Sequence, residues 1–227
     1  MAWKMNYSAA ENSKCPEQHQ DSCRNQSRLP FWLLGVYLLE VVLLGISPAD
    51  RTTWLAENIT ALIPVTVLCV MYWRGIRFSN TAYLLMMMFF VLHTIGGHYT
   101  FAKVPLDPVM DFFGFERNHF DRVCHFLVGT FAFPALEYLD GKKMIRSRAA
   151  AALLVILGIF GVAAVFELVE WIYAELAEPE AGLAFLGSQG DIWDAQKDML
   201  ADGLGGCLTV GLYRCLRWGR KHRNLSV

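Results

Sequence analysis

Carboxylate and imidazole side chains recur at helical spacing in the second half of the chain. The pairs are Asp121 with His125, Glu167 with Glu170, and Asp194 with Asp198. Residues three or four positions apart share one face of a helix, so each pair would point in a single direction. Imidazole and carboxylate together suit Zn, Mn or Fe, whereas Ca takes oxygen ligands alone. The spacing therefore predicts a site for one of these divalent transition metals.

A metal held in such a site would support hydrolysis. Binding lowers the pKa of a water molecule from 15.7 to about 7, which supplies a nucleophile at neutral pH. A carboxylate that does not bind the metal would serve as general base. The expected metal ligands are His98, His125, Asp121 and Asp198, and the expected catalytic residues are Glu167, Glu170 and Asp194. The rest of the polar cluster is expected to comprise His93, His119, Asp191 and Arg122.

Simple structural explanations compete with the interpretation as a metal site. The sequence also lacks HExxH, the motif of many zinc proteases. The helix dipole stabilises an acid in the first turn, or an imidazolium in the last, by about 0.3–1 kcal/mol. This effect alone would explain Asp121, Asp191, Asp194, His93 and His98. Glu167 and Glu170 differ, because carboxylates near the C-terminus of a helix oppose its dipole. His125 and Asp198 lie one turn inside their helices, where capping no longer applies.

The segments that would carry these residues are long and apolar. Apolar residues make up 55% of the 227-residue chain, and charged residues make up 18%, against about 25% in ordinary soluble domains. A net charge of −1 argues against nucleic-acid binding. Six segments approach the roughly 20 apolar residues that cross a bilayer: 31–47, 54–73, 81–97, 121–139, 149–173 and 194–216. We therefore expect an all-α, polytopic transmembrane bundle of six helices in contact with the lipid bilayer.

The positions of Lys and Arg orient this bundle. With the N-terminus inside the cell, 15 basic residues lie in cytoplasmic segments and five in outer ones, as the positive-inside rule requires. The chain then divides into a polar cytoplasmic tail (1–29), a six-helix membrane domain (30–216) and a basic cytoplasmic tail (217–227). Residues 1–29 lack the apolar stretch of a cleavable signal peptide. Cys15, His19 and Cys23 in this tail match no zinc-binding spacing.

This topology brings the candidate residues to the periplasmic end of the bundle. The third and fifth segments end beside the candidate acids and histidines, and the fourth and sixth segments begin beside them. In the outer loop 98–120, Asp107 followed by Pro108 predicts the start of a short helix on the membrane surface. The last segment is rich in glycine, which predicts close helix packing; the glycines are Gly203, Gly205, Gly206 and Gly211.

Four motifs resemble the YjdF family of bacterial inner-membrane proteins. The match extends from about residue 31 to 213, and the motifs are, in this order, HTIGGHYTFAKVPL, RNHFDRVCHF, ELVEW and LGSQGDIWDAQKDM. The resemblance implies a polytopic inner-membrane protein and brings no activity, substrate or cofactor with it. The residues that match the family pattern are Gly97, His98, Tyr99, Arg117, Asn118, His119, Asp121, Arg122, His125, Glu167, Glu170, Trp171, Gln189, Gly190, Asp191, Asp194, Gln196 and Asp198. Val128 and Lys197 stand where the family pattern has glutamine and an aromatic residue, which argues against a role that needs an amide at position 128.

Three functions fit these observations. The first is a membrane-embedded, metal-dependent hydrolase that acts on a lipid-linked or periplasmic small molecule. The second is a proton-coupled transporter, for which Asp202, Glu137 and Glu40 are the available steps toward the cytoplasm, although the two halves of the chain show no repeat. The third is a non-catalytic membrane scaffold, in which the polar groups pair to lock the bundle.

Overall fold

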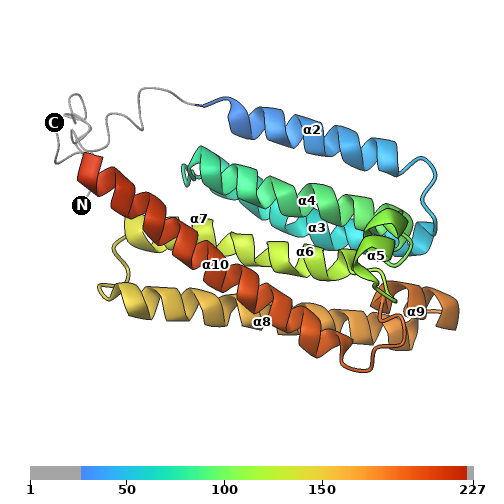
Figure 1. The fold of residues 1–227 in the computed structure, drawn as a ribbon. Helices are drawn as coiled ribbons and strands as arrows, with labels where there is room; N and C mark the ends of the chain where they lie inside the picture. Colours follow the sequence, from blue (N-terminus) through green and yellow to red (C-terminus); the bar gives the residue numbers. More distant parts are fainter. Residues whose placement is uncertain (1–26, 224–227) are drawn as a thin grey trace, which may run out of the picture.

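The computed structural model describes residues 27–223, and their regular structure is helical (Figure 1). The helices are α2 (Leu29–Leu44), α3 (Arg51–Trp73), α4 (Asn80–Tyr99), α5 (Asp107–Phe113), α6 (Phe120–Val128), α7 (Ala132–Gly141), α8 (Arg148–Leu176), α9 (Pro179–Leu186) and α10 (Asp194–Arg223). The all-α class is therefore confirmed for this range. Residues 1–26 of the predicted N-terminal tail and residues 224–227 of the predicted C-terminal tail lie outside the described residues.

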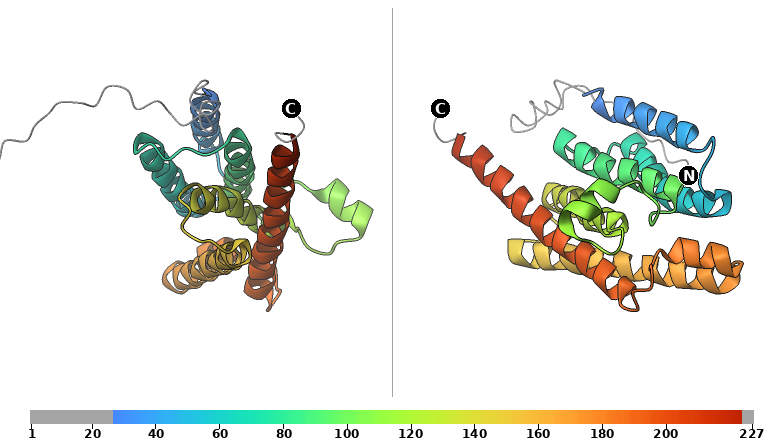
Figure 2. Two further views of the ribbon diagram at one scale, coloured as in Figure 1. Left: turned by 90° about the vertical axis from the view of Figure 1, so that its left-hand side faces the viewer. Right: turned by 45° about the vertical axis from the view of Figure 1, so that its right-hand side comes forward.

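The long helices run up and down along one another (Figures 1 and 2). Both ends of the described chain lie at one end of the bundle, and the short helices α5 and α9 lie at the other. α3, α4 and α8 are long and apolar enough to cross a membrane, and α2 is a shorter apolar helix. Leu153, Leu157 and Val165 on α8 are exposed. Such an outward apolar surface suits hydrocarbon rather than water.

Side-chain caps explain where three of the helices begin. Asp50 accepts a hydrogen bond from the backbone N–H of Thr53 at 2.6 Å, at the start of α3. Ser79 and Ser147 cap α4 and α8 in the same way. Each bond satisfies one of the N–H groups that the start of a helix leaves free. The polar turns between apolar segments thus set these boundaries close to the predicted ones.

The fourth predicted segment, 121–139, is not one continuous helix. α6 ends at Val128, a 3₁₀ turn covers Gly129–Phe131, and α7 begins at Ala132. Pro134 lies in the first turn of α7, where the missing N–H of proline costs no hydrogen bond. In an unbroken helix the same proline would remove an internal bond. The continuous segment predicted for residues 121–139 is therefore interrupted at Gly129–Phe131.

The last helix is longer than predicted. α10 continues to Arg223, so residues 217–223 of the predicted C-terminal tail extend the helix beyond the apolar segment. Arg217 pairs with the carboxylate of Asp140 on α7, and the hydroxyl of Tyr213 donates to the same carboxylate at 2.8 Å. These polar contacts hold the end of α10 against α7.

Glycines bring α10 against α6. A Cβ atom on Gly205 would overlap the carbonyl of Phe126, and one on Gly129 would overlap the backbone of Gly205 and Gly206. α10 therefore approaches α6 and the 3₁₀ turn after it backbone to backbone, which a larger residue at either position would prevent. This confirms the packing role predicted for Gly205. A Cβ atom on Gly211 would meet nothing within 4 Å, so that glycine has no such role.

The main apolar core fills the end of the bundle nearest the chain ends. Along α4, the buried residues Ala82, Met86 and Phe90 come first, and His93 follows one turn later. The change from apolar to polar marks the boundary between the core and a buried polar layer. This polar layer lies toward the end that carries α5 and α9 (Figure 1).

Candidate metal centre

α6 and α10 bring three metal-ligand candidates together. One side-chain nitrogen or oxygen atom of each of Asp121, His125 and Asp198 lies within 4.8 Å of the others. Asp121 and His125 occupy successive turns of α6, and Asp198 comes from α10, which the glycine contact holds close. His125 and Asp198 are buried, with 6% and 3% of their surface exposed. The structure thus joins three of the four predicted ligands, here called the metal-ligand group.

Both ring nitrogens of His125 face carboxylates. Nδ1 lies 3.0 Å from Oδ2 of Asp202, one turn beyond Asp198 on α10, and donates to it. Nε2 lies 3.7 Å from Oδ1 of Asp121 and 3.9 Å from Oε1 of Glu167 on α8. A histidine whose Nδ1–H is held by a carboxylate presents a lone pair on Nε2, as metal-ligating histidines do. Carboxylates from three helices therefore surround one oriented imidazole.

Several carboxylate oxygens around this imidazole are buried without a hydrogen-bond partner among residues 27–223. They are Oε1 of Glu167, Oδ1 of Asp198 and Oδ1 of Asp202. A buried acceptor left unpaired costs about 1–3 kcal/mol, and more when it is charged. A bound cation would remove this cost, because carboxylate oxygens are common metal ligands. The donor set, one imidazole with several carboxylates, fits the metal predicted from the sequence.

The three predicted catalytic residues have different surroundings. Glu167 lies beside the metal-ligand group, as described above. Glu170 is buried about one turn further along α8, with 8% of its surface exposed. Asp194 pairs with Arg117 at 2.5 Å and with Arg122 at 3.1 Å. Asp194 is thus held in ion pairs with two arginines, so the general base is better sought in Glu167 or Glu170.

Ion pairs tie the loop before α10 to the start of α6. This outer ion-pair cluster consists of Arg117, Arg122, Asp191, Asp194 and Lys197. Lys197 contacts Asp191 at 2.6 Å, and Arg122 contacts the same carboxylate at 2.7 Å. Hydrogen bonds from Lys197, and to a smaller extent from Arg122, hold the pKa of Asp191 well below its usual range. Nε of Arg122 also lies 3.6 Å from Oδ1 of Asp198, so the outer ion-pair cluster borders the metal-ligand group.

A pair of amide contacts fixes the same junction. The side chain of Gln189 accepts from the backbone N–H of Asn118 and donates to its carbonyl, both at 2.9 Å. The buried side chain of Asn118 donates to the carbonyl of Val104 at 2.7 Å and accepts from the N–H of Phe120 at 3.0 Å. Two outer loops are thereby held against the first turn of α6, which positions the residues that follow it.

Two predicted histidines lie outside the metal-ligand group. His98 donates from Nδ1 to the carbonyl of Leu44 at 2.7 Å, which joins α4 to the end of α2. Its imidazole therefore serves a helix junction and does not meet the other three predicted ligands. His119 accepts a hydrogen bond from Arg122 at 3.3 Å. Burial and the positive charges of Arg122 and Arg117 lower the pKa of His119, so its ring is neutral near pH 7.

A second buried pair joins α3 to α4. Nε2 of His93 donates to the backbone carbonyl of Glu57 at 3.2 Å and lies 3.5 Å from its carboxylate oxygen Oε2. Glu57 is 2% exposed. Gly97 permits this approach, because a Cβ atom there would lie only 3.1 Å from that of Glu57. His93, expected in the polar cluster, thus contacts a neighbouring helix and not the metal-ligand group.

Sequence reasoning missed two acids of this polar layer. The site predicted from the sequence includes neither Glu57, which stands in an apolar segment, nor Asp202, which the sequence offers as a step in a proton path. The sequence spacing indicates that Asp202 belongs with the other acids of α10, because Asp194, Asp198 and Asp202 recur every four residues and share one helix face. Glu57 is a charged residue inside a membrane segment, and such residues usually face the interior of the bundle.

Comparison with known proteins relates the chain to membrane proteins. It is similar to the inner membrane protein YjdF of Escherichia coli (strain K12), with 36% identity over 188 residues, which cover 82% of this chain and 86% of that protein. No solved structure matches the chain. Residues 29–218 match the family described as predicted membrane protein (DUF2238). The chain is therefore an inner-membrane protein and belongs to the DUF2238 family of predicted membrane proteins.

Proposed function

We propose that the chain crosses the inner membrane six times, with both termini in the cytoplasm, and that it holds a divalent transition metal near the periplasmic face. The crossing segments are α2, α3, α4, α6 with α7, α8 and α10. Their alternating direction supports an even number of crossings (Figure 1). The excess of Lys and Arg in the segments on the side of the chain ends supports a cytoplasmic location for that side.

The surroundings of His125 carry the metal proposal. Its Nδ1 is held by Asp202, and its Nε2 faces Asp121 and Glu167. Buried oxygens of Glu167 and Asp198 have no hydrogen-bond partner among the described residues. A metal on Nε2 would satisfy these oxygens and complete a site of one imidazole and two or three carboxylates. That set of ligands suits Zn, Mn or Fe.

A metal-dependent hydrolase is the activity that this site supports best. A bound metal would supply an activated water at neutral pH, and Glu170, buried about one turn further along α8 than Glu167, would be the general base. The substrate is a lipid-linked or periplasmic small molecule, because the site lies at the outer end of the bundle. α5 projects from the side of that end (Figure 2), and its Phe112 and Phe113 are exposed. A helix with such a face suits the membrane surface.

The described residues give a proton-coupled transporter less support. A relay needs titratable groups from the site to the cytoplasm. On the cytoplasmic side of the site, the buried side chains of α4 and α10 are Ala82, Met86, Phe90, Thr209, Val210 and Tyr213. Glu137, one of the steps considered, instead accepts a hydrogen bond from the backbone N–H of Ser79 at 2.9 Å. A layer of buried side chains without carboxylates or histidines therefore lies between the site and the cytoplasm in these helices.

Metal analysis of the full-length protein tests the proposal. Protein purified in mild detergent, loaded separately with Zn, Mn or Fe and freed of excess, is expected to retain about one metal per chain with at least one of them. His125→Ala and Asp198→Asn should lose it, whereas His119→Ala, a histidine variant outside the metal-ligand group, should keep it. A folded wild-type protein that retains no metal would contradict the proposal and favour the scaffold hypothesis.

The hydrolase assignment has a separate test. The metal-loaded protein is incubated with nitrophenyl ester and nitrophenyl phosphate probes, and release of nitrophenol is followed. Wild-type protein should hydrolyse at least one probe. Glu170→Gln should lose most of this activity at unchanged metal content, because only the base is removed. Equal activity in Glu170→Gln and the wild type would contradict the role given to Glu170.

A further inference from the structure

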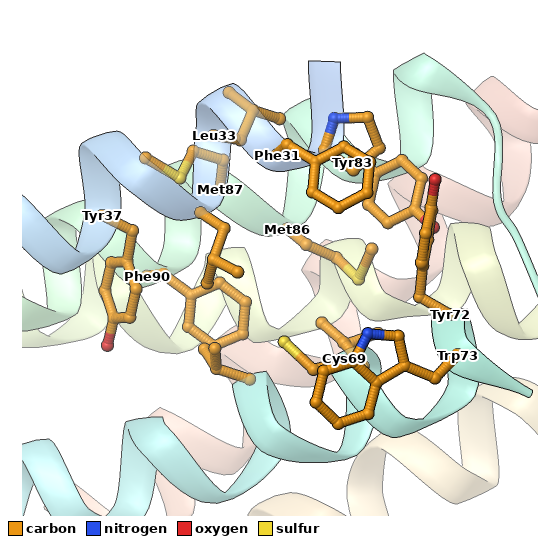
Figure 3. Close-up of a pocket in the computed structure, with 14 residues that line it drawn as sticks. Phe31, Leu33, Tyr37, Cys69, Tyr72, Trp73, Tyr83, Met86, Met87 and Phe90 are labelled. Carbon is orange, nitrogen blue, oxygen red and sulfur yellow. The ribbon is translucent and has the colours of Figure 1, made fainter. Parts of the chain in front are cut away.

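A cavity lies at the opposite end of the bundle from the metal-ligand group. It occupies about 200 Å³ between α2, α3 and α4 (Figure 3). Its walls are apolar and aromatic, and they include Phe31, Leu34, Leu68, Cys69, Met86 and Phe90. The cavity lies within the part of the bundle where all three helices are apolar. Its contents must therefore suit a hydrocarbon environment.

The packing of α2 leaves this volume open. α2 packs along α4. It meets α3 through Phe31 and Tyr72, whose rings are 5.2 Å apart edge to face, and Tyr37 and Phe90 lie 5.5 Å apart at the deep end. An empty apolar volume forfeits dispersion contacts, and apolar cavities of about 150 Å³ take up guests such as benzene. In a bilayer core, which lacks water, the available guest is a lipid acyl chain.

Aromatic side chains gather at one end of the cavity, here called its mouth. Figure 3 shows Tyr72, Trp73 and Tyr83 gathered at one end, with Tyr37 and Phe90 at the other. The three residues at the mouth belong to the end of α3 and the start of α4. Trp and Tyr concentrate where the hydrocarbon core of a membrane meets the headgroups. The mouth therefore lies at headgroup depth, in the cytoplasmic leaflet if the chain has the proposed orientation.

Positive charges flank this mouth. Arg28 precedes α2, and Arg74 and Arg77 follow α3. All three are exposed, and none takes part in the ion pairs formed among residues 27–223. The guanidinium group of Arg77 lies over the ring of Tyr72, 4.6 Å from its centroid, which holds this charge beside the cavity. Basic residues between helices on the cytoplasmic side attract anionic headgroups.

We propose that this cavity binds one acyl chain of an anionic phospholipid from the cytoplasmic leaflet, with the headgroup at Arg74 and Arg77. The aromatic mouth fixes the depth of the lipid, the apolar walls hold the chain, and the arginines, which form no ion pair among residues 27–223, select the charge. The leaflet assignment rests on the proposed orientation of the bundle, whereas lipid binding itself does not. The lipid also fills the gap between α2 and α3, so it stabilises the position of α2.

Retained lipid tests this proposal. The full-length protein is reconstituted into nanodiscs of phosphatidylglycerol and phosphatidylethanolamine in equal amounts, released into mild detergent, and examined by native mass spectrometry. The wild type should retain about one phosphatidylglycerol per chain, in clear excess over phosphatidylethanolamine. Leu34→Trp and Leu33→Trp, which fill the cavity, should lose the lipid. Leu39→Trp should keep it, because Leu39 is 59% exposed and does not line the cavity.

The remaining outcomes separate the parts of the proposal. The triple variant Arg28→Gln, Arg74→Gln and Arg77→Gln should retain both lipids about equally, because the three charges that flank the mouth are gone. The proposal would be overturned if the wild type retained no lipid or retained both lipids equally. It would also be overturned if Leu34→Trp and Leu33→Trp both folded and kept the lipid in full. So would a dimer that the cavity variants abolish, because a second copy would then be the occupant. Metal content should be unchanged in Leu34→Trp, so failure here leaves the metal proposal intact.

Discussion

Replacement of Asp202 by asparagine tests how the imidazole of His125 is oriented. Asp202 is fully buried, and its Oδ2 lies 3.0 Å from Nδ1 of His125. The substitution keeps the shape of the side chain but removes the negative charge that fixes the imidazole tautomer. Loss of such an outer partner typically weakens metal binding by about 10–100-fold, which corresponds to about 1.4–2.7 kcal/mol. We expect Asp202→Asn to weaken metal binding by this amount.

The assay is competition for the metal with a fluorescent chelator of known affinity, using full-length protein in detergent. Asp140→Asn is the matched control, because Asp140 pairs with Arg217 and Tyr213 at the other end of the bundle. Its metal affinity should equal that of the wild type. Unchanged affinity in Asp202→Asn would refute the orienting role. A loss well beyond about 100-fold would mean that Asp202 binds the metal directly.

Three further predictions follow from the same structure. Gly205→Ala should lower the free energy of unfolding by about 1–3 kcal/mol, because its methyl group would overlap the backbone of α6. Gly211→Ala, where a methyl group meets open space, should raise the free energy of unfolding by about 0.5–1 kcal/mol. Equal effects of the two variants in denaturant unfolding would contradict the packing described. The ion pairs of Asp191 lower its pKa, so they stabilise the fold above the ordinary pKa of Asp, about 3.9, and this contribution fades as pH falls below it. The thermal midpoint of Asp191→Asn should therefore depend less on pH, between about 6 and 3, than that of the wild type. An identical pH dependence would count against the ion pairs. His98→Ala should keep its metal but lose about 1 kcal/mol of stability, because its imidazole binds the carbonyl of Leu44; metal loss in this variant would restore His98 as a ligand.

The helical fold could be predicted because a bilayer imposes one length on every apolar segment. The predicted starts at residues 54, 81 and 149 lie close to Arg51, Asn80 and Arg148, where α3, α4 and α8 begin. The extension of α10 to Arg223 could not be predicted from hydropathy, because polar contacts with α7 support it. Pro134 signalled the break between α6 and α7, but an apolar segment conceals such a break from a count of apolar residues.

The candidate site could be predicted in part for a geometric reason. Antiparallel segments bring their alternate ends together, so Asp121, His125 and Asp198 share a depth as well as a helix face. Depth alone could not separate His98 from this group, because the direction of its ring depends on a contact with the end of α2. Glu57 lay on a helix with a single acid in an apolar stretch, and only tertiary packing shows that it contacts α4.

The central claim is that one imidazole and several carboxylates hold a metal at the outer end of the bundle. X-ray absorption spectroscopy of the full-length protein, loaded with Zn, tests it most directly. We predict a single imidazole nitrogen at about 2.0–2.1 Å with carboxylate oxygens at about 2.0–2.2 Å, and no imidazole signal in His125→Ala. A sulfur ligand at about 2.3 Å, as the buried Cys124 would supply, or a wild-type spectrum with two imidazoles, would contradict this account.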